Sequence, residues 1–398
     1  MSESAVLEKL LDGEAVEWLQ LGELTKIKTG QAVNKRMIAE NAGDYPVINS
    51  GREPLGYINQ WNTENDPIGI TTRGAGVGSI TWQEGKYYRG NLNYSISIRD
   101  EARLQTNYLL HLLLYMQPEI QALCTYDGIP ALNAGNLKQL LIPIPCPENP
   151  EKSLAIQAEI VRILDAFTEL TTELTTELTA RKKQYNYYRD QLLTFDLPAG
   201  RQGKGDASLP DRQVEWKTLG EVAIIGTGSH DTKDAVDEGE HIFYARGVKP
   251  LRLNSYDFDE TSIITAGDGA GVGKVFHWAQ GKYALHQRAY RIVPDGEMEA
   301  RYVYHYIVAN FYDYITRTSV SSSVTSLRKP MFFKFPIPCP SLAEQARIVA
   351  ILDKFDTLTH SISSGLPREI ELRKNQYEYY RDLLLNFPKP ELQDERVV

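Results

Sequence analysis

A chain of 398 residues is too long for one ordinary compact domain, so its length predicts two to four domains. Its 42% hydrophobic and 24% charged residues are typical of globular proteins, and the absence of a long apolar run argues against a membrane-spanning protein. The formal net charge of −9 argues against a uniformly basic nucleic-acid-binding protein, so any DNA-binding surface must be local or completed by another subunit.

The N-terminus and the cysteines indicate a cytoplasmic protein without a metal site. Residues 1–16 are expected to form a helical segment, and their acidic residues stand where a secretory signal would have basic and then apolar ones. Cys124, Cys146 and Cys339 form no CxxC pair and cannot pair off evenly. This usage suits a reducing compartment and argues against structural zinc.

Residues 17–147 are predicted to form a first globular domain of mixed α+β structure. Short runs of Gly, Tyr, Ile, Val and Thr alternate with turn residues, and PIGITTRGAGVGSITW at 67–82 predicts a strand, a Gly turn and a second strand. The apolar stretch 106–116 has helical length. The Pro-rich PIPCP at 143–147 predicts an extended end to the domain because proline cannot continue a helix.

Residues 148–196 are predicted to form a long central helix. Some forty residues at ~1.5 Å each would span roughly 60 Å. An apolar stripe recurs along it at steps of three and four residues: Ile156, Ile160, Ile163, Phe167, Leu170, Leu174 and Leu178. A lone helix would leave this stripe in water, so the stripe predicts a partner helix.

The rest of the chain repeats this plan after an exposed linker at 197–214. The expected parts are a second globular domain at 215–340, a second long helix at 341–387 and a tail at 388–398. GAGVG at 74–78 recurs at 269–273, PIPCP recurs at 336–340, and both helices end in similar strings, QYNYYRDQLLTF and QYEYYRDLLLNF. Such ordered matches predict a tandem duplication of one module with a period near 195 residues. Because Gly365 and Pro367 interrupt the second helical pattern, its continuity stays open.

Three features recur in the same order in both modules. They are a Trp-x-x-Leu-Gly-Glu opening at Trp18 and Trp216, a Gly-rich turn, and PIPCP followed by a Gln-x-x-Ile-Val-x-Ile-Leu-Asp helix from Gln157 and Gln345. In this arrangement the whole chain resembles the specificity subunits of type I restriction–modification systems. The resemblance implies an α+β fold with two mixed α/β target-recognition domains in tandem duplication. They would be separated by two long conserved spacer helices, packed as an antiparallel coiled coil with pseudo-twofold symmetry.

The same resemblance implies a function without chemistry in this chain. Each target-recognition domain would read one half of a split, asymmetric site in double-stranded DNA. Two modification subunits, which bind S-adenosylmethionine and methylate adenine, would dock on the two related modules. Two restriction subunits, which use ATP and Mg, would join them in defence against foreign DNA, and no cofactor is expected on this chain.

Candidate DNA contacts are the polar and basic residues of loops and predicted turns, because base edges and phosphates take hydrogen bonds from these side chains. In the first domain they are Lys28, Gln31, Asn34, Lys35, Arg36, Arg52, Arg73, Arg89 and Asn91. In the second they are Arg246, Lys249, Arg252, Arg317, Ser321, Ser322, Arg328 and Lys329. The alternative for each of them is a solvated surface group.

Two sets of residues on the helices are candidates for assembly. The matching strings place Tyr185, Tyr187, Tyr188 and Arg189 in one module and Tyr377, Tyr379, Tyr380 and Arg381 in the other. They could form a shared docking surface, pack the helix pair, or do both. The tetrad repeat TELTTELTTELTA at 168–180, with Leu170, Leu174 and Leu178, suggests a ruler for the unread spacer between half-sites. The alternative is an ordinary amphipathic helix.

A search for catalytic motifs finds none. GDGAGVGK at 267–274 has Asp268 and Val275 where a phosphate-binding P-loop needs Gly and Ser or Thr. The Asn/Asp-Pro-Pro-aromatic loop of related adenine methyltransferases and the HExxH motif are also absent from the sequence. Two other functions stay open at this point, a coiled-coil scaffold with two non-DNA ligand domains and an enzyme acting alone.

Overall fold

The computed structural model describes residues 5–51, 53–195, 214–318, 327–361 and 363–389 of the chain. They fall into two compact units, a first unit of residues 1–174 and 370–398 and a second unit of residues 175–369. Each unit contains mixed α/β structure and segments of long helices, and the predicted fold class of two such domains in tandem with long helices is confirmed. The predicted linker at 197–214 lies almost entirely outside the described residues.

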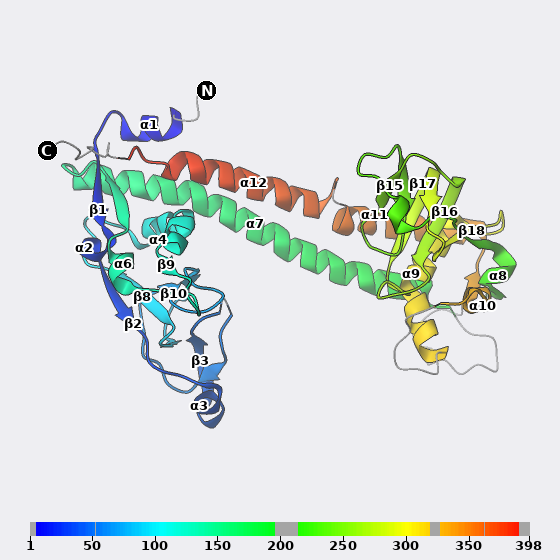
Figure 1. The fold of residues 1–398 in the computed structure, drawn as a ribbon, viewed down its shortest axis with the longest axis horizontal. Coiled ribbons are helices and arrows are strands. Elements are labelled where there is room, and N and C mark those ends of the chain that lie inside the picture. The colour runs from blue at the N-terminus through cyan, green and yellow to red at the C-terminus, as the bar shows by residue number, and fades with distance from the viewer. Residues whose placement is uncertain (1–4, 52, 196–213, 319–326, 362, 390–398) are drawn as a thin grey trace. The chain divides into compact units, whose positions relative to one another are not determined.

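The first unit begins with a short helix and continues into small sheets (Figure 1). Its elements before the long helix are α1 (Ala5–Leu11), β1 (Val16–Gln20), α2 (Leu21–Leu24), β2 (Thr25–Thr29), α3 (Lys35–Glu40), β3 (Ala42–Ile48), β4 (Tyr57–Ile58), β5 (Ile68–Thr71), β6 (Ile80–Trp82), β7 (Tyr88–Arg89), β8 (Asn93–Ile98), α4 (Thr106–Tyr115), α5 (Gln117–Ala122), β9 (Cys124–Thr125), β10 (Ala131–Leu132), α6 (Ala134–Lys138) and β11 (Leu141–Pro145). The strands form a four-stranded sheet in the order β2-β8-β5-β6, a three-stranded sheet β4-β3-β7, and the pairs β1-β11 and β9-β10.

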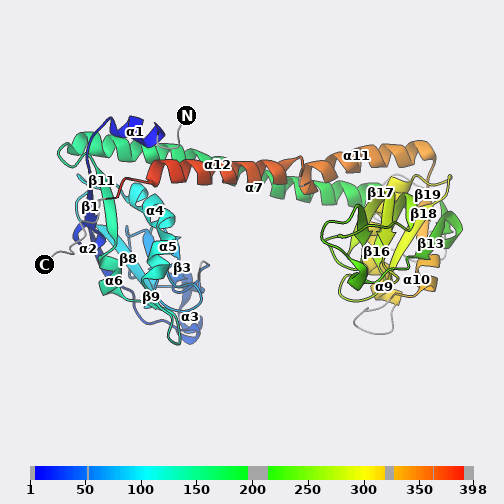
Figure 2. The ribbon, with the colours of Figure 1, turned by 45° about the horizontal axis from the view of Figure 1, so that its top comes forward.

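The second unit carries the repeat of this plan, with one larger six-stranded sheet and a separate β12-β19 pair. Its elements are β12 (Glu215–Thr218), α8 (Leu219–Val222), β13 (Ala223–Thr227), η1 (Thr232–Asp234), β14 (His241–Tyr244), β15 (Leu251–Leu253), β16 (Phe258–Ala266), β17 (Phe276–Leu285), β18 (Ala289–Pro294), α9 (Ala300–Thr318), α10 (Lys329–Phe333), β19 (Pro336–Cys339) and α11 (Leu342–His360). The sheet order is β13-β18-β16-β17-β14-β15, and α9 packs on β16 and β18 (Figure 2).

One long strand explains why the second sheet is continuous and its counterpart is split. The ten residues of β17 pair antiparallel with β16 and then parallel with β14, so they join both halves of the sheet. In the first unit the same stretch is broken into β6 and β7, of three and two residues. Its partner β5 has only four residues and begins just after Pro67, which lacks the N–H needed to continue a ladder.

Proline also explains the two-stranded ribbons at the end of each module. In the PIPCP segments the prolines remove ladder donors, so these strands form isolated antiparallel pairs with the Trp-containing openings. Trp18 lies opposite Pro143, and Trp216 lies opposite Pro338. The extended end predicted for each domain is thus a strand, β11 or β19.

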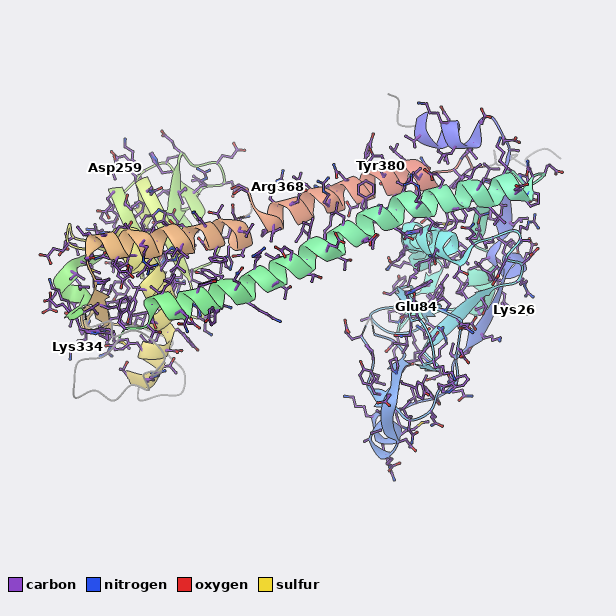
Figure 3. All side chains as sticks on the ribbon, turned by 180° about the vertical axis from the view of Figure 1, so that it is seen from behind. Lys26, Glu84, Asp259, Lys334, Arg368 and Tyr380 are labelled. Carbon is purple, nitrogen blue, oxygen red and sulfur yellow. The ribbon has the colours of Figure 1, made fainter. Side chains whose placement is uncertain are left out.

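The long helix α7 (Pro150–Leu193) contributes its first part to the first unit and its last part to the second. In the first unit it lies beside α12 (Leu366–Leu385), and Phe167 stacks on Tyr380 with ring centroids 5.1 Å apart. Ile160 of the predicted stripe and the neighbouring Leu164 are buried in one cluster with Leu384 of α12. Figure 3 shows Tyr380 on α12.

In the second unit α7 pairs antiparallel with α11. Tyr185 contacts the ring of His360, with centroids 5.6 Å apart, and Tyr188 stacks on the earlier Phe355 at 5.6 Å. The partner number falls as the α7 number rises, which is the signature of an antiparallel pair. The predicted second helix is interrupted, because α11 ends at His360 and α12 begins at Leu366 after Gly365, whose φ is +80°.

Candidate nucleic-acid interface

Each globular domain presents a Gly-rich turn between two strands, β5 and β6 in the first and β16 and β17 in the second. Gly74 and Gly78 have φ of +92° and +77°, and Gly269 and Gly273 have +81° and +68°. Residues with a Cβ rarely adopt this conformation, so glycine is needed for these turns. The predicted strand, Gly turn and strand are therefore present in both modules.

The middle glycine of each turn allows a close approach to a neighbouring loop. A Cβ on Gly76 would lie 3.1 Å from the carbonyl oxygen of Ser50, and one on Gly271 would lie 2.6 Å from that of Arg246. A third segment joins by a backbone bond, from Thr72 to Leu92 in one domain and from Gly267 to Arg288 in the other. The two domains thus build the same three-segment frame.

In the first domain this frame brings several predicted DNA contacts together. Arg73 is exposed within the Gly-rich turn, and Asn91 is exposed in the turn from β7 to β8, next to the bond between Thr72 and Leu92. The backbone N–H of Gln31 donates to the carbonyl of Arg89 at 2.9 Å, which brings Gln31 to the same turn. The segments that carry these three predicted residues are therefore all bonded to, or part of, the turn from β7 to β8.

Arg89 has a structural place in the interior, which corrects its prediction as a DNA contact. Its side chain is 2% exposed, and its guanidinium donates to the carbonyls of Tyr94 at 2.9 Å and Asp66 at 2.8 Å. It also contacts the Asn93 side chain and the Tyr87 hydroxyl. Burial lowers the pKa of Arg89 to about 10, against the opposing effect of Asp66. A buried guanidinium bonded to carbonyls holds strands together and cannot reach a phosphate.

The remaining candidates of the first domain lie on β2 and α3. Lys28 is exposed on β2 and lines, with Gln31, a cavity of about 250 Å³ that also contains the acidic Glu64 and Asp66. The Asn34 side chain accepts a bond from Met37 N–H at 2.9 Å and so caps α3. In both ribbon views α3 lies at the end of this domain away from α7 and α12 (Figures 1 and 2).

The two basic residues of α3 are exposed, and Arg36 pairs with Glu40 at 2.7 Å. Lys35 opens the helix. Arg52 lies outside the described residues.

In the second domain the frame holds a charged cluster. Asp268, in the Gly-rich turn, accepts a bond from Arg246 at 2.8 Å and another from Arg288 at 3.1 Å. The Arg246 side chain is 39% exposed, that of Arg288 is 63% exposed, and that of Asp268 is 23% exposed. Burial raises the pKa of Asp268, but the two arginines outweigh it and the pKa is lowered, so the carboxylate stays charged.

Sequence reasoning missed Asp268 and Arg288. The duplication offers a signal for Arg288, because when the two modules are aligned Asn91 of the first domain is equivalent to Gln287, the residue before Arg288. Transferring the prediction for Asn91 to the second module would have reached this turn. The sequence by itself marks Asp268 only as a mismatch to a P-loop.

The other candidates of the second domain surround the frame or lie apart from it. Lys249 and Arg252 are exposed after β14 and on β15. Leu327 N–H donates to the Gly267 carbonyl at 2.7 Å, which places the following Arg328 and Lys329 beside the Gly-rich turn.

The last candidates of this domain are on or after α9. Arg317 has a side chain that is 81% exposed and lies in the last turn of that helix. Ser321 and Ser322 lie outside the described residues.

In each module an equivalent glutamine on the long helix forms hydrogen bonds to the globular domain. The Gln157 side chain is fully buried, accepts a bond from Gln105 N–H at 2.9 Å and donates to the Arg103 carbonyl at 3.0 Å. Gln345 accepts from Glu299 N–H at 2.7 Å and donates to the Pro340 carbonyl. Gln105 and Glu299 immediately precede α4 and α9. The side chains of Gln157 and Gln345 therefore accept hydrogen bonds from backbone N–H groups at the N-termini of these two domain helices, which have no partner within the helix.

Two further repeated contacts join the domain helix to the long helix. His111 bonds Asp165 at 2.8 Å, and His305 bonds Asp353 at 2.7 Å. In the second unit Arg301 adds a bond to Asp353 at 2.7 Å. Partial burial raises the pKa of Asp353, but the bonds from His305 and Arg301 outweigh it, so the pKa is lowered. These attachments are alike in the two modules, in contrast to the side chains at the Gly-rich turns.

The tyrosines on the helices divide into inward and outward groups. Tyr185 is 8% exposed, and burial raises its pKa to about 12. Tyr188 stacks on Phe355, as Tyr380 stacks on Phe167. The counterpart of Tyr185 on α12, Tyr377, is partly buried against the core of the first unit.

The outward members are Tyr187 and Tyr379, which are 61% and 53% exposed. The ring of each makes an edge-to-face contact with the ring of the tyrosine that follows it, with centroids 5.5 Å apart. The next residues, Arg189 and Arg381, pair with adjacent aspartates at 2.7 Å.

Within the part of the chain that the structure describes, no helix combines the length and apolar character needed to span a membrane. The described residues also hold no group of three or more His, Cys, Asp or Glu side chains suited to a metal ion.

Comparison with known proteins places both modules in one family. The family described as "Type I restriction modification DNA specificity domain" matches residues 14–182 and again residues 212–372. The EcoR124I/EcoR124II specificity subunit of Escherichia coli is 39% identical over 98% of this chain and 99% of its own length. The EcoprrI specificity subunit of the same species is 31% identical over 91% of this chain and 93% of its own.

A solved structure shares the fold. The S subunit of a type I restriction–modification system from M. genitalium matches with a TM-score of 0.66 at 18% identity, covering 95% of this chain and 98% of that one.

Proposed function

Because this chain belongs to the family of type I restriction–modification DNA specificity subunits, we propose that it reads a split, asymmetric DNA site with its two recognition domains. The observation that carries the proposal is a contrast between the two modules. The attachments to the long helices use the same glutamine and the same His–Asp pair in both modules, whereas the exposed side chains on the Gly-rich frames differ. Two domains that read different half-sites need the same attachment to the helices but different side chains to contact the bases.

The acidic net charge is compatible with this function because basic side chains are concentrated locally on the second frame. Arg246 and Arg288 of the second frame both bond Asp268, and Arg328 and Lys329 follow Leu327, whose N–H donates to the Gly267 carbonyl. Lys and Arg contacts to phosphates supply much of DNA affinity, and base-edge contacts supply the sequence preference. A bound partner can add further phosphate contacts.

We infer that the chemistry belongs to partner subunits. Two modification subunits would bind S-adenosylmethionine and methylate adenine, and two restriction subunits would use ATP and Mg. The repeated outward tyrosines, Tyr187 and Tyr379, are suited to dock one copy each of the same modification subunit. Tyrosine is enriched at the centres of protein–protein interfaces.

Purification of the full chain with its modification subunit tests this assembly. Native mass spectrometry should give one specificity subunit with two modification subunits, and affinity for duplex DNA should fall steeply with salt because counterions are released. Tyr187→Ala combined with Tyr379→Ala should weaken the assembly without unfolding either unit. A scaffold with non-DNA ligand domains would instead show no salt-dependent affinity for duplex DNA, and that result would contradict the proposal.

We propose that the tetrad repeat in α7 sets the spacer between the half-sites. Leu170, Leu174 and Leu178 are half-buried on a helix that runs unbroken through the repeat. Removing four residues shortens a helix by ~6 Å and turns it by little more than one full turn, so the leucine face is nearly kept. Since base pairs of duplex DNA rise about 3.4 Å, deleting residues 171–174 should shorten the spacer by one or two base pairs. An unchanged spacer in the methylated motif would rule the ruler out.

A further inference from the structure

We propose that Arg288 reads a guanine in the half-site of the second recognition domain, with Asp268 and Arg246 as its positioning residues. This inference rests on the proposed function and adds the base class and the residues that read it.

Backbone contacts fix where the two arginines stand. The Gly267 N–H donates to the Arg288 carbonyl at 2.8 Å, and a Cβ on Gly267 would lie 2.7 Å from that oxygen. A Cβ on Gly271 would lie 2.6 Å from the carbonyl of Arg246. The Gly-rich turn thus packs between the segments that carry Arg246 and Arg288, and Asp268 in this turn bonds both side chains.

The bonds to Asp268 orient the Arg288 guanidinium. One carboxylate oxygen of Asp268 accepts a hydrogen bond from Arg246 at 2.8 Å, and the other accepts one from NH1 of Arg288 at 3.1 Å. The remaining edge of a guanidinium, NH2 with Nε, is the donor pair that guanine O6 and N7 accept in the major groove. Holding the side chain in advance reduces the conformational entropy that binding would cost.

Exposure distinguishes this cluster from an ion pair that serves the fold. Arg288 is 63% exposed, and exposed pairs contribute little to stability because water and salt screen them. The interior ion pair of Arg291 with Glu260 on the same sheet is far less exposed, at 17% and 25%. Arg246, the less exposed of the two cluster arginines, holds Asp268, and Arg288 extends from it into solvent.

The first domain carries different side chains on the same frame. Ser50, Arg73 and Leu92 occupy the positions of Arg246, Asp268 and Arg288, as the matching backbone contacts of Gly76 with Ser50 and of Thr72 with Leu92 show. Side chains that change at all three positions while the frame is kept are expected of positions that read different bases.

The test maps N6-methyladenine after the full chain is co-expressed with its modification subunit in a host without adenine methylation. The wild-type motif should contain a G·C pair in the second half-site. Arg288→Gln should relax that one position, with discrimination falling roughly ten- to a hundredfold, while the first half-site and the spacer stay unchanged. Asp268→Asn should relax the same position to a smaller extent.

A matched control is Lys282→Gln, which removes one charge at the other end of the β16–β17 hairpin, where Lys282 pairs with Asp259 in the ladder. It should leave the motif as in the wild type. The unchanged first half-site shows in each variant that the complex has folded and assembled. A second half-site without a G·C pair, or an Arg288→Gln variant that methylates all sites less without changing any base preference, would overturn the inference. Absence of any split motif with the wild-type chain would instead overturn the proposed function.

Discussion

Replacing Gln345 by Leu should detach the second recognition domain from its long helix at one point. The Gln345 side chain is 1% exposed, and its amide links Glu299 N–H at 2.7 Å with the Pro340 carbonyl at 2.9 Å. Leucine has a similar volume but pairs with neither group. A partly buried group left without a partner costs about 1–3 kcal/mol, so the two together should lower the free energy of unfolding by about 2–6 kcal/mol.

The assay combines thermal unfolding with hydrogen exchange. For a unit of this size about 1 kcal/mol shifts Tm by ~2–4 °C, so the second unit should unfold about 4–24 °C lower. Exchange should increase at Glu299 in this variant, and at Gln105 in the equivalent Gln157→Leu variant, because these amides lose their acceptors. Gln139→Leu, at an exposed position, should stay within about 0.5 kcal/mol of the wild type. Unchanged Tm and exchange in Gln345→Leu would refute the fastening role.

Three further outcomes follow from the same structure. Tyr188→Ala should lower the free energy of unfolding of the second unit by about 1–2 kcal/mol through loss of the Phe355 stack, whereas Tyr187→Ala should change it by less than about 0.5 kcal/mol and weaken capture of the modification subunit. Arg73→Gln should alter bases of the first half-site in the methylated motif and leave the second half-site as it is; a change in the second half would contradict the assignment. The lowered pKa of Asp353 should make the wild type more stable than Asp353→Asn above about pH 3.9, the unfolded pKa of Asp, with the difference lost as pH falls through the lower folded pKa. A Tm difference between these two proteins that does not shrink on acidification would contradict that prediction.

The architecture could be predicted from the sequence because the duplication repeats each sequence pattern that indicates a helix, a turn or a strand. Each apolar stripe on a long helix appears twice, and each Gly-rich turn and PIPCP segment has a copy that confirms its type. The interruption at residues 361–365 could be suspected from Gly365 and Pro367, but the end of α11 at His360 could not, because local pattern does not fix helix termini to a residue.

The site was less predictable because side-chain type does not reveal burial. Arg89 belongs to the residue class that reads DNA, yet the carbonyls of Asp66 and Tyr94 surround it in the interior. Arg288 was missed although it is exposed, because the sequence does not show that it bonds Asp268, which lies twenty residues away along the chain. Pairs of this kind are created by topology, and a single sequence shows neither partner as special.

The measurement that tests the account most directly is the methylome of a host without adenine methylation that expresses the modification subunit, with and without this chain. The account predicts a split, asymmetric motif with a fixed spacer that appears only when the chain is present. A stable complex of the two subunits that produces no new methylated motif would contradict it.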